Sequence, residues 1–198
     1  KMEAIGSDVP ANYPVALQGK TIAGYAVAIE NVATGRQTLN TELLTTLTET
    51  VAGMTNGTQT TDVLLTGLGD VAFKTTYEKW VGEHASASEN LSAWYIPTLS
   101  QLSAFMGTLF TMKDVPATGS EDFKNIPEFE FVNGKMFDRE TIATVNYASS
   151  TINNQGNVSG VRINVADGVV TNAQEAGISV KTALNQQALC RPMITIFK

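Results

Sequence analysis

Residues 94–102 (WYIPTLSQL) constrain the fold most, because an aromatic pair leads through a proline into the start of a helix. Pro97 disfavours helical backbone at Ile96, so the chain should arrive extended and then turn. Thr98 and Gln101 are spaced as in a capping box, in which a hydroxyl and an amide bind backbone N–H groups that lack helical partners. The apolar residues that follow recur at helical spacing: Leu99, Leu102, Phe105, Met106, Leu109 and Phe110. The sequence therefore predicts a helix directly after this junction.

Length and charge exclude several classes of protein. A chain of 198 residues that is 43% hydrophobic can form the core of one domain without disulfides. No apolar run approaches the ~20 residues that cross a bilayer, so no transmembrane segment is expected. The net charge is −6 and the 13 Lys and Arg residues are scattered, which argues against a nucleic-acid partner.

The two ends of the chain carry different signals. Residues 1–20 contain Pro10 and Pro14 and are predicted to be an N-terminal arm or linker, with residues 21–198 as a single domain. Residues 21–32 predict a strand, and the alternating stretch 189–197 predicts another, with Pro192 at an edge or bulge. We expect strands near the two ends to pair with each other and close the domain.

Helices and turns are predicted between these strands. A short helix is expected from residue 40 or 41 to Gly53, and a second after an N-cap at Asp70, with one apolar face. The residues of that face are Phe73, Tyr77, Trp80, Val81 and His84. Turns are predicted at Asn56-Gly57, Asn133-Gly134 and Asp167-Gly168, the last two within hairpins. The order of elements predicts an α+β domain with antiparallel sheets and two or three helices.

The chain lacks the residue sets that common catalytic and metal sites need. His84, the only histidine, is interpreted as a core or helix-end residue. Cys190, the only cysteine, lies in a predicted strand with no basic motif to stabilise a thiolate. The sequence has no zinc ligand set, calcium loop, phosphate-binding glycine loop or nucleophile elbow, and no carboxylate pair stands out for glycoside chemistry. We therefore expect a non-enzymatic protein with no cofactor and no metal.

An uncharged polar run at residues 149–157 (SSTINNQGN) is the main candidate for ligand binding. Amides offer donors and acceptors without charge, which suits sugar hydroxyls or a polar protein surface. Asn-rich loops are also typical of simple turns, and both interpretations stay open. The candidate binding residues are the amides of this run and two beyond the Asp167-Gly168 turn: Asn153, Asn154, Gln155, Asn157, Asn172 and Gln174.

Four motifs in order resemble the bacterial C-type-lectin-like domain of the Lcl and major-paralogue type, found in Bacteroidetes surface proteins and pilus-associated lipoproteins. Residues 94–102 resemble the W-x-L-P-S/T-x-x-E-L element of that family, and residues 147–151 (YASST) its aromatic-Ser-Ser-Thr signature. Residues 165–170 (VADGVV) are similar to its D-G-x-V hairpin, and residues 191–193 (RPM) to the R-P-V element of its last strand. Together the four motifs cover about residues 94–197.

The resemblance implies a C-type-lectin-like fold with paired terminal strands, in a protein that is exported or attached to the cell surface. Gln101 stands where the family usually has glutamate, and Ala148 where it usually has tryptophan. The Glu-Pro-Asn, Gln-Pro-Asp and Trp-Asn-Asp motifs of calcium-dependent sugar binding are missing. So is the active-site cysteine pair of formylglycine-generating enzymes, which share the broader fold.

From the motifs and the missing catalytic sets we expect a surface adhesion domain that binds a glycan or a protein ligand. Its binding face would be the long-loop region, roughly residues 146–157 and 171–176. The first alternative is a structural pilus or cell-envelope subunit whose N-terminal arm links to another domain or donates a strand. The second is an enzyme related to sulfatase-modifying proteins. The export signal or anchor is expected to lie outside this chain.

Overall fold

A computed structural model describes residues 3–11, 13–33, 35, 37–39, 56–111, 144–153, 155–164, 179–181, 184 and 187–198. Within these ranges the protein is a mixed α+β structure with antiparallel sheets, as the sequence predicts. The helix predicted from residue 40 or 41 to Gly53 and the turns at Asn133-Gly134 and Asp167-Gly168 lie outside them.

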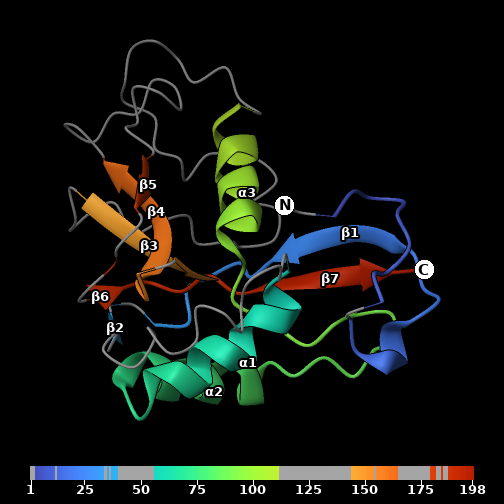
Figure 1. The fold of residues 1–198 in the computed structure, drawn as a ribbon, viewed down its shortest axis with the longest axis horizontal. Helices are drawn as coiled ribbons and strands as arrows, with labels where there is room; N and C mark the ends of the chain where they lie inside the picture. The colour runs from blue at the N-terminus through green and yellow to red at the C-terminus, as the bar shows by residue number, and fades with distance from the viewer. Residues whose placement is uncertain are drawn as a thin grey trace.

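The described ranges contain three α-helices and three small sheets (Figure 1). The helices are α1 (Gly57–Leu68), α2 (Ala72–Glu83) and α3 (Leu99–Thr111), and a 3-10 turn, η1, covers Val15–Leu17. The strands are β1 (Ile22–Val27), β2 (Gln37–Thr38), β3 (Thr144–Ile152), β4 (Val158–Asn164), β5 (Ser179–Lys181), β6 (Gln187–Ala188) and β7 (Met193–Phe197). The sheets have the orders β1-β7, β2-β6 and β3-β4-β5. Helices α1 and α3 both pack against β3, and α2 packs against β2.

The strands near the two ends of the chain pair with each other, which confirms the predicted closure. β1 and β7 run antiparallel side by side, with Ile22 opposite Phe197 and Val27 opposite Met193 (Figure 1). The predicted strand 189–197 is shorter than expected, because β7 begins only at Met193. Pro192 lies directly before it and accepts a hydrogen bond from the Ala28 N–H at 2.9 Å. Its missing N–H therefore interrupts no ladder.

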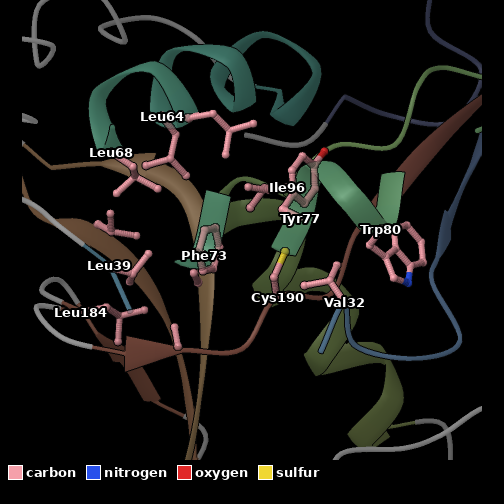
Figure 2. Packing of buried hydrophobic residues seen from close by; sticks show 14 of the residues in the cluster. Val32, Leu39, Leu64, Leu68, Phe73, Tyr77, Trp80, Ile96, Leu184 and Cys190 are labelled. Atoms are coloured by element: carbon pink, nitrogen blue, oxygen red, sulfur yellow. The ribbon is translucent and has the colours of Figure 1, made fainter. Parts of the chain in front are cut away.

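The main core forms between α1, α2 and the segments that lead into the last strands (Figure 2). Of the predicted apolar face of α2, Val81 is half-buried and His84 is exposed, while Phe73, Tyr77 and Trp80 are buried in this core. Burying a side chain of this kind contributes about 1.5–3 kcal/mol. They meet other buried residues: Leu39, Leu64, Leu68, Ile96, Leu184 and Cys190. The helical spacing in the sequence thus identified the correct side of α2.

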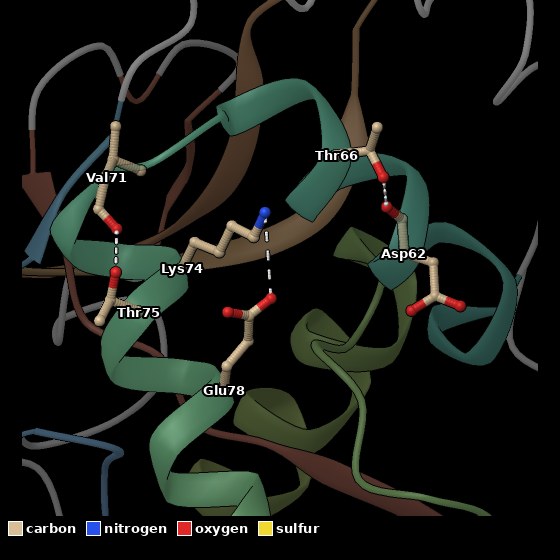
Figure 3. Close-up of polar contacts among 6 residues, drawn as sticks. All are labelled: Asp62, Thr66, Val71, Lys74, Thr75 and Glu78. Atoms are coloured by element: carbon tan, nitrogen blue, oxygen red, sulfur yellow. Dashed lines mark hydrogen bonds and ion pairs between the residues drawn. The ribbon is translucent and has the colours of Figure 1, made fainter.

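The exposed sides of α1 and α2 carry local polar contacts (Figure 3). The hydroxyls of Thr66 and Thr75 donate to carbonyls four residues earlier, at 2.8 and 3.3 Å. Lys74 and Glu78 form an ion pair at 4.0 Å, and an exposed i,i+4 pair of this kind contributes about 0.3–0.5 kcal/mol. The buried faces therefore stabilise these helices more than the exposed ones. None of the helices in the described ranges has the length and apolar character to cross a membrane.

Two predictions about helix starts are wrong. Asn56-Gly57 is not a turn between helices: Asn56 is the N-cap of α1, and its Oδ1 accepts the Thr58 N–H at 2.8 Å. Asparagine favours turns and N-caps for the same reason, a side-chain oxygen that binds nearby N–H groups. Asp70 does not cap α2, because Val71 takes that position and makes no side-chain cap. Gly69 ends α1 at φ 64°, and Asp70 lies in the short connection that follows.

A substitution at Gly160 in β4 tests how closely β3 and β4 pack. A Cβ there would overlap the carbonyl oxygen of Tyr147 and the side chain of Leu184. We expect Gly160→Ala to lower the free energy of unfolding by about 2–3 kcal/mol, as overpacked cores do. Gly82 in α2 has no atom within 4 Å of a Cβ, so Gly82→Ala should raise the free energy by ~0.5 kcal/mol. Denaturant unfolding measures both, and equal stability of the two variants would contradict this packing.

Candidate functional site

Residues 153 and 155–157, between β3 and β4, contain three of the predicted binding residues and are called the β3–β4 turn here. Asn153 organises it: its Oδ1 accepts the N–H groups of Gln155 and Asn157, both at 2.9 Å. The Asn153 backbone bonds Asn157 and Gly156, also at 2.9 Å. Gly156 adopts φ 77°, in the left-handed region that glycine reaches without strain. The backbone of the turn is thus specified by one side chain and one glycine.

The structure brings together three of the six predicted binding residues. Asn153, Gln155 and Asn157 share this turn, with Gln155 exposed and the other two half-buried. Asn154, Asn172 and Gln174 lie outside the described residues. The side-chain oxygen of Asn153 shapes the turn, and the sequence did not reveal this structural function.

The first part of the polar run is not a loop. Residues 149–152 belong to β3, and Ser149 and Ser150 are fully buried. The Ser149 hydroxyl donates to the Ser159 carbonyl at 2.7 Å and the Ser150 hydroxyl to the Ile96 carbonyl at 2.8 Å. Thr151 Oγ1 accepts the Leu99 N–H, the first in α3, at 2.9 Å. The predicted long loop over residues 146–157 is therefore wrong for residues 146–152, which lie in β3. Buried hydroxyls with backbone partners are compatible with a strand.

Gln101 in α3 joins the N-termini of two helices. Its Oε1 accepts the Thr98 N–H at the start of α3 and the Gly57 N–H at the start of α1, each at 3.0 Å. The Gln101 N–H donates to Thr98 Oγ1 at 3.3 Å, which confirms the predicted capping box. The amide nitrogen donates to the Tyr95 hydroxyl at 3.2 Å. Gln101 is fully buried, so all of these groups are shielded from water.

Further buried hydroxyls extend this network to the sheets. Thr61 Oγ1 accepts the Ile96 N–H at 2.8 Å, which ties α1 to the junction before α3. Tyr95 and Thr195 share a hydrogen bond between hydroxyls at 3.0 Å, which ties the junction to β7. Thr60 of α1 bonds Ser150 of β3. The network therefore connects α1, α3, β3 and β7, and the β3–β4 turn lies at the end of β3.

His84 lies at the end of α2, which is one of the two positions predicted for it, the core or a helix end. It is the exposed C-cap residue, its ring stacks on Trp80 with centroids 4.1 Å apart, and its Nδ1 lies 2.8 Å from the Trp80 carbonyl. Trp94 packs edge-on against Trp80 at 5.2 Å and donates its Nε1–H to the His84 carbonyl at 2.7 Å. These contacts give His84 a structural function at the helix end.

Cys190 and Arg191 are both buried before β7. Burial raises the pKa of the Cys190 thiol, and the neighbouring Arg191 acts in the opposite direction. Arg191 donates from Nε to Asn31 Oδ1 at 2.8 Å and from a terminal nitrogen to the Ala28 carbonyl at 3.1 Å. Burial lowers the pKa of its guanidinium, and Tyr147 acts against this shift. Arg191 thus fixes the approach to β7 against the segment after β1.

The described residues contain no group of three or more His, Cys, Asp or Glu side chains that could hold a metal ion. What the β3–β4 turn offers a ligand is uncharged amide chemistry. Comparisons with protein-family models, curated proteins and solved structures give no match to this chain.

Gln101 allows a direct test of the network. Gln101→Leu leaves the Gly57 and Thr98 N–H groups without an acceptor, and each buried unpaired group costs about 1–3 kcal/mol. We expect unfolding free energy to fall by ~2–5 kcal/mol. Gln101→Glu keeps both acceptors and places negative charge at two helix N-termini, where it is favourable, so its loss should be smaller. Denaturant titration ranks the variants, and the reverse order would contradict the geometry.

The environment of Cys190 predicts its reactivity. The thiolate is the nucleophile that attacks a disulfide reagent, and burial disfavours the thiolate of Cys190. In the folded protein at mildly alkaline pH, a disulfide reagent such as DTNB should therefore react negligibly with Cys190. In concentrated guanidinium it should release one equivalent of product, because the chain has one cysteine. Rapid reaction of the folded protein would show that Cys190 is accessible.

Proposed function

We propose that this chain is a non-enzymatic adhesion domain of a bacterial surface protein, with a C-type-lectin-like fold. It binds a glycan or a protein ligand through a face that includes the β3–β4 turn and the candidate residues Asn154, Asn172 and Gln174. The observation that carries the proposal is an amide-rich turn whose backbone is fixed by Asn153 and whose base rests on a buried network.

The rigidity of the turn supports binding. Recognition residues commonly lie on loops that a stable scaffold positions. Here Ser149 and Thr151, two polar residues near the end of β3, bond to β4 and to the start of α3. Gln155 is therefore an exposed amide on a backbone that has little freedom, and a ligand that binds it has little ordering entropy to overcome.

The positions of the family-like motifs support the proposed fold. The described motifs lie in or beside regular elements: residues 94–102 lead into α3, residues 147–151 are part of β3, and Arg191 precedes β7. Gln101, in the place of the usual glutamate, still makes the capping contacts. The β1–β7 pair agrees with the paired terminal strands that the family has.

Two alternatives stay predictions. A structural pilus or envelope subunit would use the same scaffold for assembly, and polymerisation that depends on residues 1–20 would favour it. An enzyme related to sulfatase-modifying proteins would need a redox-active cysteine. Activity on peptide thiols that is lost in a Cys190→Ala variant would favour that enzyme.

Binding is tested by amide substitutions in the turn. We expect Gln155→Ala and Asn157→Ala to weaken binding about tenfold together, since one or two lost hydrogen bonds of ~0.5–1.5 kcal/mol each give that change. The measurements are a glycan array and adhesion to bacterial or host cells.

The matched control is Asn90→Ala, which removes an exposed amide outside the turn and should leave binding unchanged. Asn153→Ala is unsuitable as a binding test, because it removes two bonds that shape the turn. Ligand binding that survives the double substitution would place the site elsewhere.

A further inference from the structure

Residues 6–9 pair with residues 20–22, at the outer edge where β1 begins. The Gly6 N–H donates to the Ile22 carbonyl at 2.7 Å, and the Ile22 N–H donates to the Ser7 carbonyl at 2.9 Å. The Val9 N–H donates to the Lys20 carbonyl at 2.9 Å. Asp8 faces Thr21 in an antiparallel bridge. The contacts have the pattern of β-augmentation, in which an extended peptide pairs with the edge of a sheet.

Two side chains anchor the segment at its ends. Val9 is 7% exposed and packs with Tyr13, Ile22 and Phe197 in a small cluster. At the other end, the Glu3 carboxylate accepts hydrogen bonds from the Asn56 amide at 3.0 Å and from the Tyr13 hydroxyl at 3.4 Å. A segment that pairs here in the same way therefore needs a carboxylate at one end and an apolar side chain at the other.

The segment is separable from the main core. None of residues 3–9 belongs to the described core cluster of α1 and α2. It continues to β1 through residues 10–20, which contain Pro10 and Pro14 and an exposed 3-10 turn. The Gln18 amide binds the Pro10 and Ala11 carbonyls, at 3.2 and 3.1 Å, and this contact organises the connection locally. Departure of the segment from β1 therefore opens the small cluster around Val9 and breaks the Glu3–Asn56 bond, but it leaves the main core closed.

We propose that residues 3–9 exchange between copies of this chain, so that the segment of one copy pairs with β1 of a second copy. Each copy carries the same segment and the same acceptor groups, Asn56, Ile22 and Phe197. An exchanged segment therefore makes the contacts seen within one chain. Such swapping of identical elements is a low-cost route to dimers, and its extent depends on concentration.

The register supplies a chemical test. Asp8 and Thr21 form a non-hydrogen-bonded antiparallel pair, since the bonds Val9–Lys20 and Ile22–Ser7 flank them. The Cβ atoms of such a pair are close enough for a disulfide. D8C and T21C chains are mixed in the reduced state, incubated at several concentrations and then oxidised. We expect a disulfide-linked heterodimer whose 8–21 peptide pair is found by mass spectrometry and whose yield rises with concentration.

Three controls make the result decisive. D8C mixed with A87C, at an exposed position, gives the background of random cross-linking. Adding Val9→Asp to D8C removes the apolar anchor and should reduce the heterodimer to that background. The double variant D8C/T21C should close the disulfide within one chain, which shows that both cysteines react in this register. Ready closure in the double variant with no heterodimer above background at any concentration would overturn the proposal.

Discussion

The described structure depends most on the hydrogen bonds of the Gln101 side chain. One amide oxygen accepts N–H groups from the starts of α1 and α3, and the amide nitrogen reaches Tyr95. A helix N-terminus leaves several N–H groups without partners, and burying two such ends together would be unfavourable without an acceptor between them. The convergence of the two helices therefore requires a polar residue at position 101.

The close approach of the start of α1 to Tyr95 and Ile96 also explains why residue 57 is a glycine. A Cβ at this position would overlap the Tyr95 ring and the Ile96 carbonyl oxygen, so only glycine lets α1 begin here. Thr61 then bonds the Ile96 N–H, and Ser150 bonds the Ile96 carbonyl. Both backbone groups of the residue before Pro97 are thus satisfied inside the protein. Buried networks whose members are all paired make a packing arrangement specific, because alternative arrangements would leave polar groups unpaired.

Much of this organisation was predictable from local sequence. The capping box at Thr98 and Gln101, the apolar face of α2 and the pairing of strands near the two ends are all confirmed. The capping box and the helix face depend on residues a few positions apart, whereas the pairing of β1 with β7 was expected from a predicted strand near each end of the domain. The second acceptor contact of Gln101, to Gly57, was not predictable, because no sequence pattern connects these two residues 44 positions apart.

The errors have a common physical cause. Asn56 was interpreted as a turn residue and residues 149–152 as a loop, because amides and hydroxyls usually face water. Here their partners come from distant segments, such as the Ile96 carbonyl for Ser150. In the candidate site, the sequence placed Asn153, Gln155 and Asn157 together, but it did not distinguish the residue that shapes the turn from those available to a ligand. That distinction needed the bonds of Asn153 Oδ1.

The architecture of the β3–β4 turn bears on how this surface changes during evolution. Its conformation requires the Asn153 oxygen and the left-handed backbone at Gly156, while the contributions of Gln155 and Asn157 to it come from their main-chain N–H groups. Any residue other than proline supplies such an N–H. Substitutions at positions 155 and 157 can therefore alter the chemistry of this surface while the turn keeps its shape, with little loss of stability.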